Sequence, residues 1–153
     1  MLGWLMGLIF PACAQLGTGG LPPPMLIQFA GPERIPVSRS ALAASANTVG
    51  LVPDIVLADF PVPAARLRAA VAAVAASQPL TFAHGSTGAQ DHWVARSELF
   101  NFPDLVTAQV FPRGEGAAAL VLYSRSVYGE SDLGANRKRL ETWLAQLPNQ
   151  LRD

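Results

Sequence analysis

The feature that most constrains the fold is a series of three apolar, alternating segments in the second half of the chain. They span residues 93–100, 105–111 and 118–127, and residues 113–116 between the last two are typical of a hairpin turn. Alternation places apolar side chains on one face of a strand and polar side chains on the other, which suits a half-buried antiparallel sheet. Three such strands in succession predict a meander.

Shorter signals predict a strand, a helix and another strand ahead of the meander. Residues 55–60 are apolar and rich in β-branched side chains, so we expect a strand that stops at Pro61. Residues 64–77 are rich in alanine and carry a narrow apolar stripe at helical spacing. Residues 80–83 can form a strand, and the sequence of 84–88 is typical of a polar turn.

The last element is a predicted helix over residues 133–147. Ser131 and Asp132 are suitable N-cap residues, and Pro148 is expected to end the helix. The order strand, helix, four strands, helix predicts an α+β fold. We expect an antiparallel sheet of about five strands with both helices packed on one face.

The N-terminal part of the chain differs in composition from the rest. Residues 2–10 are apolar and lead to small residues, a pattern that resembles a signal peptide cleaved after Ala14. We therefore divide the chain into a signal-like segment (1–14), a linker and extended lead-in (15–46) and a single domain (47–150). This division predicts export to the periplasm or cell envelope.

Two other interpretations of the N-terminal segment stay open. Cys13 could be a lipidated first residue after cleavage, although Phe10-Pro11-Ala12 is a poor lipobox. The segment could also be a retained tail of a cytoplasmic protein. The apolar run is too short for a spanning helix, which needs about 20 residues.

Composition excludes several classes of function. The formal net charge is zero, so the chain lacks the basic surface expected of a nucleic-acid-binding protein. A single cysteine excludes an internal disulfide and a cysteine-based metal cluster. With two histidines and no metal-binding motif, we predict no metal and no cofactor.

Two motifs identify a family. The first reads Arg96-Ser97-x-x-Phe100-x-Phe102-Pro103-Asp104. The second reads Tyr123-Ser124-Arg125-Ser126-x-x-Gly129-x-Ser131-Asp132-x-Gly134-x-Asn136-Arg137-x-Arg139. The chain resembles the bacterial and plastid "domain of unknown function 1499" family from about Asn47 to the C-terminal helix.

The resemblance implies a fold and motif positions, but no reaction. Members of this family commonly follow a signal peptide or a membrane segment, which agrees with export and with a position near a membrane. The chain departs from the family pattern at residues 45–49, where many relatives carry a proline-asparagine-cysteine-valine run. Any role of that cysteine cannot apply here.

The strongest candidate for a binding site is a group of cationic and aromatic residues. Alternation puts Arg125 on the same face of its strand as Tyr123. If the strands are close together, Arg96 and Arg125 converge on the face without helices, with Tyr128 and His92 near its edge. Guanidinium groups bind carboxylates and phosphates, so this groove would take an anionic small molecule or lipid head group.

A structural interpretation competes with this site. Arg125 could instead pair with Asp104 or Asp132, and we favour this arrangement because such internal ion pairs are common. The remaining motif residues then form a strand end, a turn and a helix start. In this interpretation Asp132 is the N-cap, Asn136 and Arg137 tie the helix to the strand, and Lys138 and Arg139 are solvated. The turn and cap residues of this motif are Ser124, Ser126, Gly129, Ser131 and Gly134.

Three hypotheses for function follow. The first is a non-enzymatic envelope domain that binds an anionic small molecule, a lipid or an envelope protein. The second is an enzyme that clamps an anionic substrate with Arg125 and uses His92 or Asp104 as acid or base, although no nucleophile motif supports catalysis. The third is a scaffolding domain with an exposed apolar patch around Trp93 or Trp143.

Overall fold

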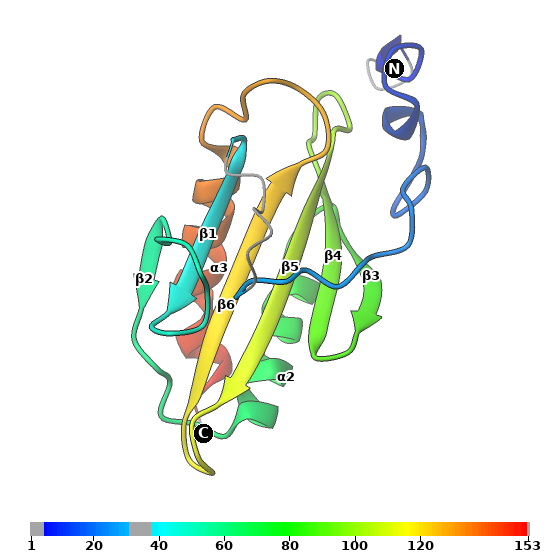
Figure 1. Cartoon of the computed structure of the whole chain (residues 1–153). Helices are drawn as coiled ribbons and strands as arrows, with labels where there is room; N and C mark the ends of the chain where they lie inside the picture. Colours follow the sequence, from blue (N-terminus) through cyan, green and yellow to red (C-terminus); the bar gives the residue numbers. More distant parts are fainter. Residues whose placement is uncertain (1–4, 31–37, 153) are drawn as a thin grey trace.

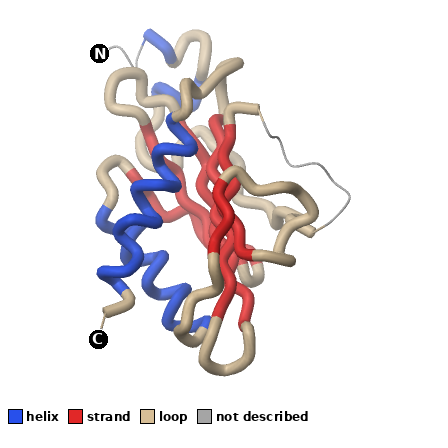
Figure 2. Tube along the Cα trace, turned by 90° about the vertical axis from the view of Figure 1, so that its left-hand side faces the viewer, coloured by secondary structure: helices blue, strands red, loops and turns tan. Residues whose placement is uncertain are grey.

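The computed structural model describes residues 5–30 and 38–152. It forms two layers, a six-stranded sheet and a pair of helices that cover one of its faces (Figures 1 and 2). The elements are η1 (Pro11–Ala14), β1 (Ser40–Ser45), β2 (Ile55–Leu57), α2 (Ala64–Ser77), β3 (Thr81–Thr87), β4 (Gln90–Arg96), β5 (Pro103–Pro112), β6 (Ala118–Ser126) and α3 (Ala135–Gln150). The α+β class and the placement of both helices on one face are confirmed.

The sheet is mixed, with the strand order β2-β1-β6-β5-β4-β3. Strands β4 to β6 form the predicted antiparallel meander, and β3 extends it by one antiparallel strand. The prediction of five antiparallel strands is wrong because β1 pairs antiparallel with β6 and parallel with β2. The missed strand, β1, lies within the predicted lead-in. Its sequence, Ser-Ala-Leu-Ala-Ala-Ser, has no β-branched or aromatic side chain, so β-strand propensity did not indicate a strand here.

Three predicted boundaries are also wrong. The predicted turn at 84–88 mostly belongs to β3, which accommodates it with an irregularity between Ala83 and Gly85. Strand β4 ends at Arg96 rather than at residue 100. Pro148 lies inside α3 near its C-terminal end, and the helix continues to Gln150.

Apolar side chains from both layers form the main core. The predicted stripe of α2 is buried there, and so are Leu140 and Leu147 of α3. Trp93 of β4 and Trp143 of α3 pack edge to face, with ring centroids 5.6 Å apart. Both tryptophans are buried. The hypothesis of an exposed patch around either one is therefore wrong.

The face of the sheet without helices carries a smaller apolar cluster. Leu42, Val121 and Tyr123 are buried there against Phe29 of the N-terminal segment. Figure 1 shows that this segment, drawn in blue, runs across β6, β5, β4 and β3. Residues predicted to be a linker therefore cover much of the face that was expected to be open.

Candidate functional site

Strand register brings four polar side chains together on the face without helices. Cross-strand partners place His92 opposite Thr107, and Thr107 opposite Tyr123. Arg125 lies two residues beyond Tyr123 on β6, so its side chain points to the same face, as predicted. These four residues are adjacent because the meander aligns β4, β5 and β6.

Residues 22–27, which we call the strap, form a roof over this group. The buried side chain of Gln90 holds one end of the strap. The Ile27 amide donates to its Oε1 at 2.9 Å, and its Nε2 donates to the Ile27 carbonyl at 2.6 Å. At the other end, His84 Nε2 lies 2.9 Å from the Pro22 carbonyl oxygen.

A cavity of about 340 Å³ lies between the strap and the sheet. Its walls are mainly apolar and include three prolines of the strap, Ile27 and Leu105. Its polar groups are His84, His92, Thr107, Tyr123 and Arg125. None of the described residues that line the cavity carries a carboxylate. Largely apolar cavities of this size with a few convergent polar groups are typical of small-molecule sites.

His92 is buried in this cavity and uses only one of its two ring nitrogens within the described part of the chain. The side chain is 5% exposed, and its Nδ1 lies 2.9 Å from Thr107 Oγ1. Its Nε2 is buried and has no hydrogen-bond partner among residues 5–30 and 38–152. Burial lowers the pKa of His92 below its usual 6.5, and the charge of His84 adds to this effect. The imidazole is therefore neutral at pH 7, and its unpaired nitrogen requires an explanation, such as a bound group.

Arg125 is half-buried and makes no ion pair or hydrogen bond with the part of the chain that the structure describes. The favoured pairing of Arg125 with Asp104 or Asp132 is wrong. Asp104 is opposite Ser126 in the register, and Ser126 points away from Arg125 on the same strand. Asp104 therefore lies on the helix-covered face, out of reach of the Arg125 guanidinium.

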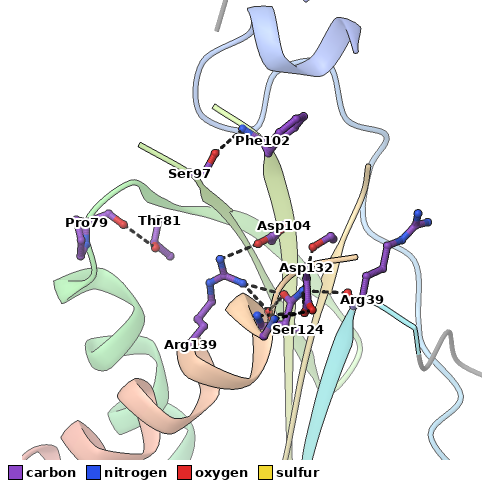
Figure 3. Close-up of polar contacts among 12 residues, drawn as sticks. Arg39, Pro79, Thr81, Ser97, Phe102, Asp104, Ser124, Asp132 and Arg139 are labelled. Carbon is purple, nitrogen blue, oxygen red and sulfur yellow. Dashed lines mark hydrogen bonds and ion pairs between the residues drawn. The ribbon is translucent and has the colours of Figure 1, made fainter. Parts of the chain in front are cut away.

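The carboxylate of Asp104 pairs with Arg139 of α3 instead (Figure 3). Arg139 Nη2 donates to Asp104 Oδ2 at 2.7 Å, and Nη1 donates to Ser124 Oγ at 2.9 Å. The Arg139 side chain is only 17% exposed, so the prediction of a solvated Arg139 is wrong. Lys138, in contrast, is exposed as predicted.

Asn136 joins the ends of β6 and α3, as predicted. Its Oδ1 accepts the Ser124 hydroxyl proton at 2.6 Å, and its Nδ2 donates to Ser126 Oγ and Asp132 Oδ2, both at 2.9 Å. The same Nδ2 also lies 2.9 Å from the Arg39 carbonyl oxygen. Asn136 is fully buried and its polar atoms are all used. This half of the motif therefore fastens a helix and offers no unpaired group to a ligand.

The turn before α3 departs from the prediction in one detail. Asp132 accepts the amides of Gly134 and Asn136 at 3.0 and 3.3 Å, which is a capping role. The N-cap position itself is Gly134, with φ of 79°. Ser131 Oγ accepts the Leu133 amide.

The remaining motif residues make surface contacts around the same turn. The Gly129 carbonyl accepts a hydrogen bond from the Arg39 side chain. Arg137 Nη1 donates to the Asp54 carbonyl at 3.3 Å, while its Nε pairs with Glu141 on the exposed side of α3. Arg137 therefore contacts the β1–β2 loop rather than the end of β6.

Arg96 and Tyr128 lie outside the cavity and bind the N-terminal segment. Arg96 is 5% exposed and donates to the carbonyls of Ala12, Gly17 and Gly19 at 2.7, 2.7 and 2.9 Å. The Ala12 amide donates to the Tyr128 hydroxyl at 3.3 Å. The four residues predicted to share a groove therefore form two pairs. His92 and Arg125 line the cavity, whereas Arg96 and Tyr128 hold the chain's own residues.

Sequence reasoning missed Thr107, Gln90 and the strap. The alternation of β5 places Thr107 on a known face, but only the cross-strand register sets it beside His92. Residues 22–24 are three prolines, and they were predicted to belong to a linker because proline has no backbone N–H to donate to a sheet. Within the described part of the chain, no cluster of histidine, cysteine or acidic residues could hold a metal ion.

Comparisons with known proteins identify one family. The sequence model described as "Protein of unknown function (DUF1499)" matches residues 36–147. This range runs from before β1 into α3, and it includes His92, Arg96, Arg125 and Tyr128 but not the strap. Neither the curated proteins nor the solved structures gave a match.

Proposed function

The chain belongs to the family described as "Protein of unknown function (DUF1499)", and we propose that it is a non-enzymatic domain that binds a small amphipathic anion beneath the strap. One observation carries the proposal. The guanidinium of Arg125 and the Nε2 of His92, neither of which has a hydrogen-bond or ion-pair partner among residues 5–30 and 38–152, line the same cavity.

The charge of the lining favours an anion with one negative charge. Arg125 supplies one permanent positive charge, and His92 is neutral because burial lowers its pKa. A guanidinium can donate two parallel hydrogen bonds to a carboxylate or to a phosphate. The neutral His92 ring can donate or accept one further hydrogen bond at Nε2.

The walls favour a ligand with an apolar body. Leu105 and Ile27 line the cavity together with the strap prolines, which cannot donate backbone hydrogen bonds. Burying apolar ligand surface there would contribute roughly 25 cal/mol per Å². A medium-chain carboxylate with a hydrocarbon tail matches both the charge and the walls.

Catalysis is a less well supported use of the same cavity. The enzymatic hypothesis named His92 or Asp104 as acid or base, and Asp104 lies on the opposite face in an ion pair with Arg139. His92 alone remains beside Arg125, and its Nδ1 faces the Thr107 hydroxyl rather than a carboxylate that would raise its basicity. Binding therefore explains the arrangement better than turnover does.

We also propose that the domain acts in the cell envelope, near a membrane. The apolar run of residues 2–10 supports export, with the segment retained rather than cleaved, because Ala12 and Cys13 are buried against the domain. The resemblance to a family that commonly follows a signal peptide or a membrane segment supports export too. Within the described residues, no helix is long and apolar enough to cross a bilayer. Cell fractionation with sequencing of the mature N-terminus tests this location, and full-length protein in the cytosol would contradict it.

Isothermal titration calorimetry with dodecanoate tests the binding proposal, at concentrations below micelle formation. We expect one site per chain for dodecanoate and no binding of dodecyltrimethylammonium, which has the same tail and the opposite charge. Arg125→Gln should weaken dodecanoate binding at least tenfold, or about 1.4 kcal/mol.

Arg113→Gln is the matched control, because Arg113 lies outside the cavity and pairs with Asp59 at 3.4 Å. It should bind dodecanoate as the wild type does. Equal binding of both amphiphiles, or unchanged affinity in Arg125→Gln, would overturn the proposal.

A further inference from the structure

The strap is continuous with a loop that is docked at the far end of β4. Residues 12–19 fold against Arg96, and the strap begins at Pro22, only three residues beyond Gly19. Arg96 and His92 are four residues apart on β4, so their side chains lie on the same face of the sheet. A movement of the docked loop would therefore be transmitted directly to the roof of the cavity.

The hydrogen-bond donors of the Arg96 guanidinium find most of their acceptors in this loop. Three of its four acceptors are the carbonyls of Ala12, Gly17 and Gly19, and the fourth is the Asn101 carbonyl. It has no carboxylate partner among the described residues. A buried cation without such a partner is costly unless dipoles surround it, so Arg96 strongly favours the docked state of the loop.

Neighbouring contacts make the docking specific. Asn101 Nδ2 donates to the carbonyls of Cys13 and Gln15 at 2.8 and 2.7 Å. The Phe10 ring packs against Tyr128, with centroids 4.9 Å apart. The docked loop is thus held by hydrogen bonds to its backbone carbonyls and by packing of the adjacent Phe10 ring against Tyr128 and Phe102.

The strap itself has few independent attachments. Its three prolines cannot donate to the sheet, and Met25 and Leu26 are exposed. Its side-chain attachments to the sheet are Gln90 at Ile27, Thr87 at Pro24 and His84 at Pro22. The end next to Gly19 has one side-chain attachment of its own, the contact of His84 with Pro22, and otherwise depends on the docked loop for its position.

We propose that Arg96 is a positioning residue that locks the strap over the cavity. By fixing residues 12–19 it keeps the strap closed, and undocking of the loop opens the cavity for ligand uptake and release. The part of this proposal that concerns a ligand rests on the proposed function, whereas the locking of the strap does not.

Gly20→Ala tests the lock without altering Arg96 or the sheet. Gly20 has φ of +76°, and an added Cβ would lie 2.9 Å from Ala12 Cα and 2.9 Å from Gln15 Cγ. The docked loop cannot accommodate this atom without shifting. Gly114→Ala is the matched control, since Gly114 has φ of +73° with nothing within 4 Å of its added Cβ. Arg96→Gln is the direct variant.

Two measurements distinguish opening of the strap from binding of the ligand. Hydrogen exchange of the Ile27 amide, measured without ligand, reports opening of the strap because this amide donates to Gln90. We expect exchange about tenfold faster in Gly20→Ala and Arg96→Gln, and unchanged in Gly114→Ala. The dissociation rate of dodecanoate should rise by a similar factor in the same two variants.

Each outcome decides between the two proposals. Unchanged Ile27 exchange in Gly20→Ala overturns the lock, even if Arg96→Gln does not fold. Faster exchange in a protein that binds no dodecanoate supports the lock and overturns the proposed function. Faster exchange with an unchanged dissociation rate would show that the strap does not control the ligand, and the proposal would fail.

Discussion

Ser124, Arg125 and Ser126 are consecutive residues with separate roles because they alternate between two faces of β6. The two serines point to the helix layer, where they bind Asn136. Arg125 points to the cavity. The motif that identifies the family therefore combines a structural fastening on one face with one candidate ligand group on the other.

His92 should titrate below the usual histidine range. Its pKa is lowered by burial and by His84, so the folded protein releases the His92 proton more readily than the unfolded chain does. Below the unfolded value of 6.5, the unfolded chain binds a proton that the folded chain does not. The free energy of unfolding should therefore fall as the pH drops from 6.5 toward the folded pKa.

Urea denaturation between about pH 5 and 7 measures this dependence, and NMR of the ring protons assigns it to His92. His92→Gln removes the titrating group and should flatten the profile. The chain has two histidines, so the remaining signal belongs to His84 alone. A His92 pKa at or above 6.5 would contradict the buried position of the ring.

At the scale of elements, α3 depends on Asn136 for its attachment to the sheet. Asn136→Ala would remove the hydrogen bonds that Asn136 makes with Ser124, Ser126 and Arg139, and Arg139 would keep only Asp104 and Ser124 as partners. Losing such a network should lower the free energy of unfolding by about 3 kcal/mol. Chemical denaturation monitored by circular dichroism measures the loss.

Arg137→Ala is the control within the same helix. Its ion pair with Glu141 is exposed and spaced i, i+4, so its loss should cost less than about 0.5 kcal/mol. Equal effects of the two substitutions would mean that Asn136 does not fasten α3.

Strand β1 shows how tertiary contacts override local preference. Its alanines and serines favour no extended structure. Five of its six residues are nevertheless buried, between α3 on one face and the N-terminal segment on the other. Small side chains suit this place because both layers approach the strand closely. Pairing on both edges, with β6 and with β2, compensates for its weak propensity.

At the scale of the whole molecule, the N-terminal segment covers the second face of the sheet. Removing residues 1–30 leaves the main core of helices and sheet, which lies within the range matched by the family. It removes Phe29 and Ile27 from the smaller cluster and exposes Tyr123. The truncated chain should still fold.

We expect its thermal midpoint to fall by on the order of 10 °C, because burial of about two large apolar side chains is lost. Binding of a hydrophobic dye should increase at the exposed face. Differential scanning calorimetry and dye fluorescence measure both effects. A midpoint equal to that of the full chain would contradict a covering role for residues 22–30.

The sequence by itself determined the elements whose signals are local. These are the helical stripe of α2, the alternation of β4 to β6 and the polar turn before α3, because period, turn residues and capping act over a few neighbouring positions. They were sufficient for the α+β class, for the family and for the face on which Arg125 lies.

Only the tertiary structure decided which side chains meet. Arg139 rather than Arg125 pairs with Asp104, and Arg96 binds the N-terminal loop rather than sharing a site with Arg125. These contacts join residues 35 to 84 positions apart, and they depend on strand order and register. Local sequence does not encode that register, because many arrangements of the same strands satisfy the same pattern of burial.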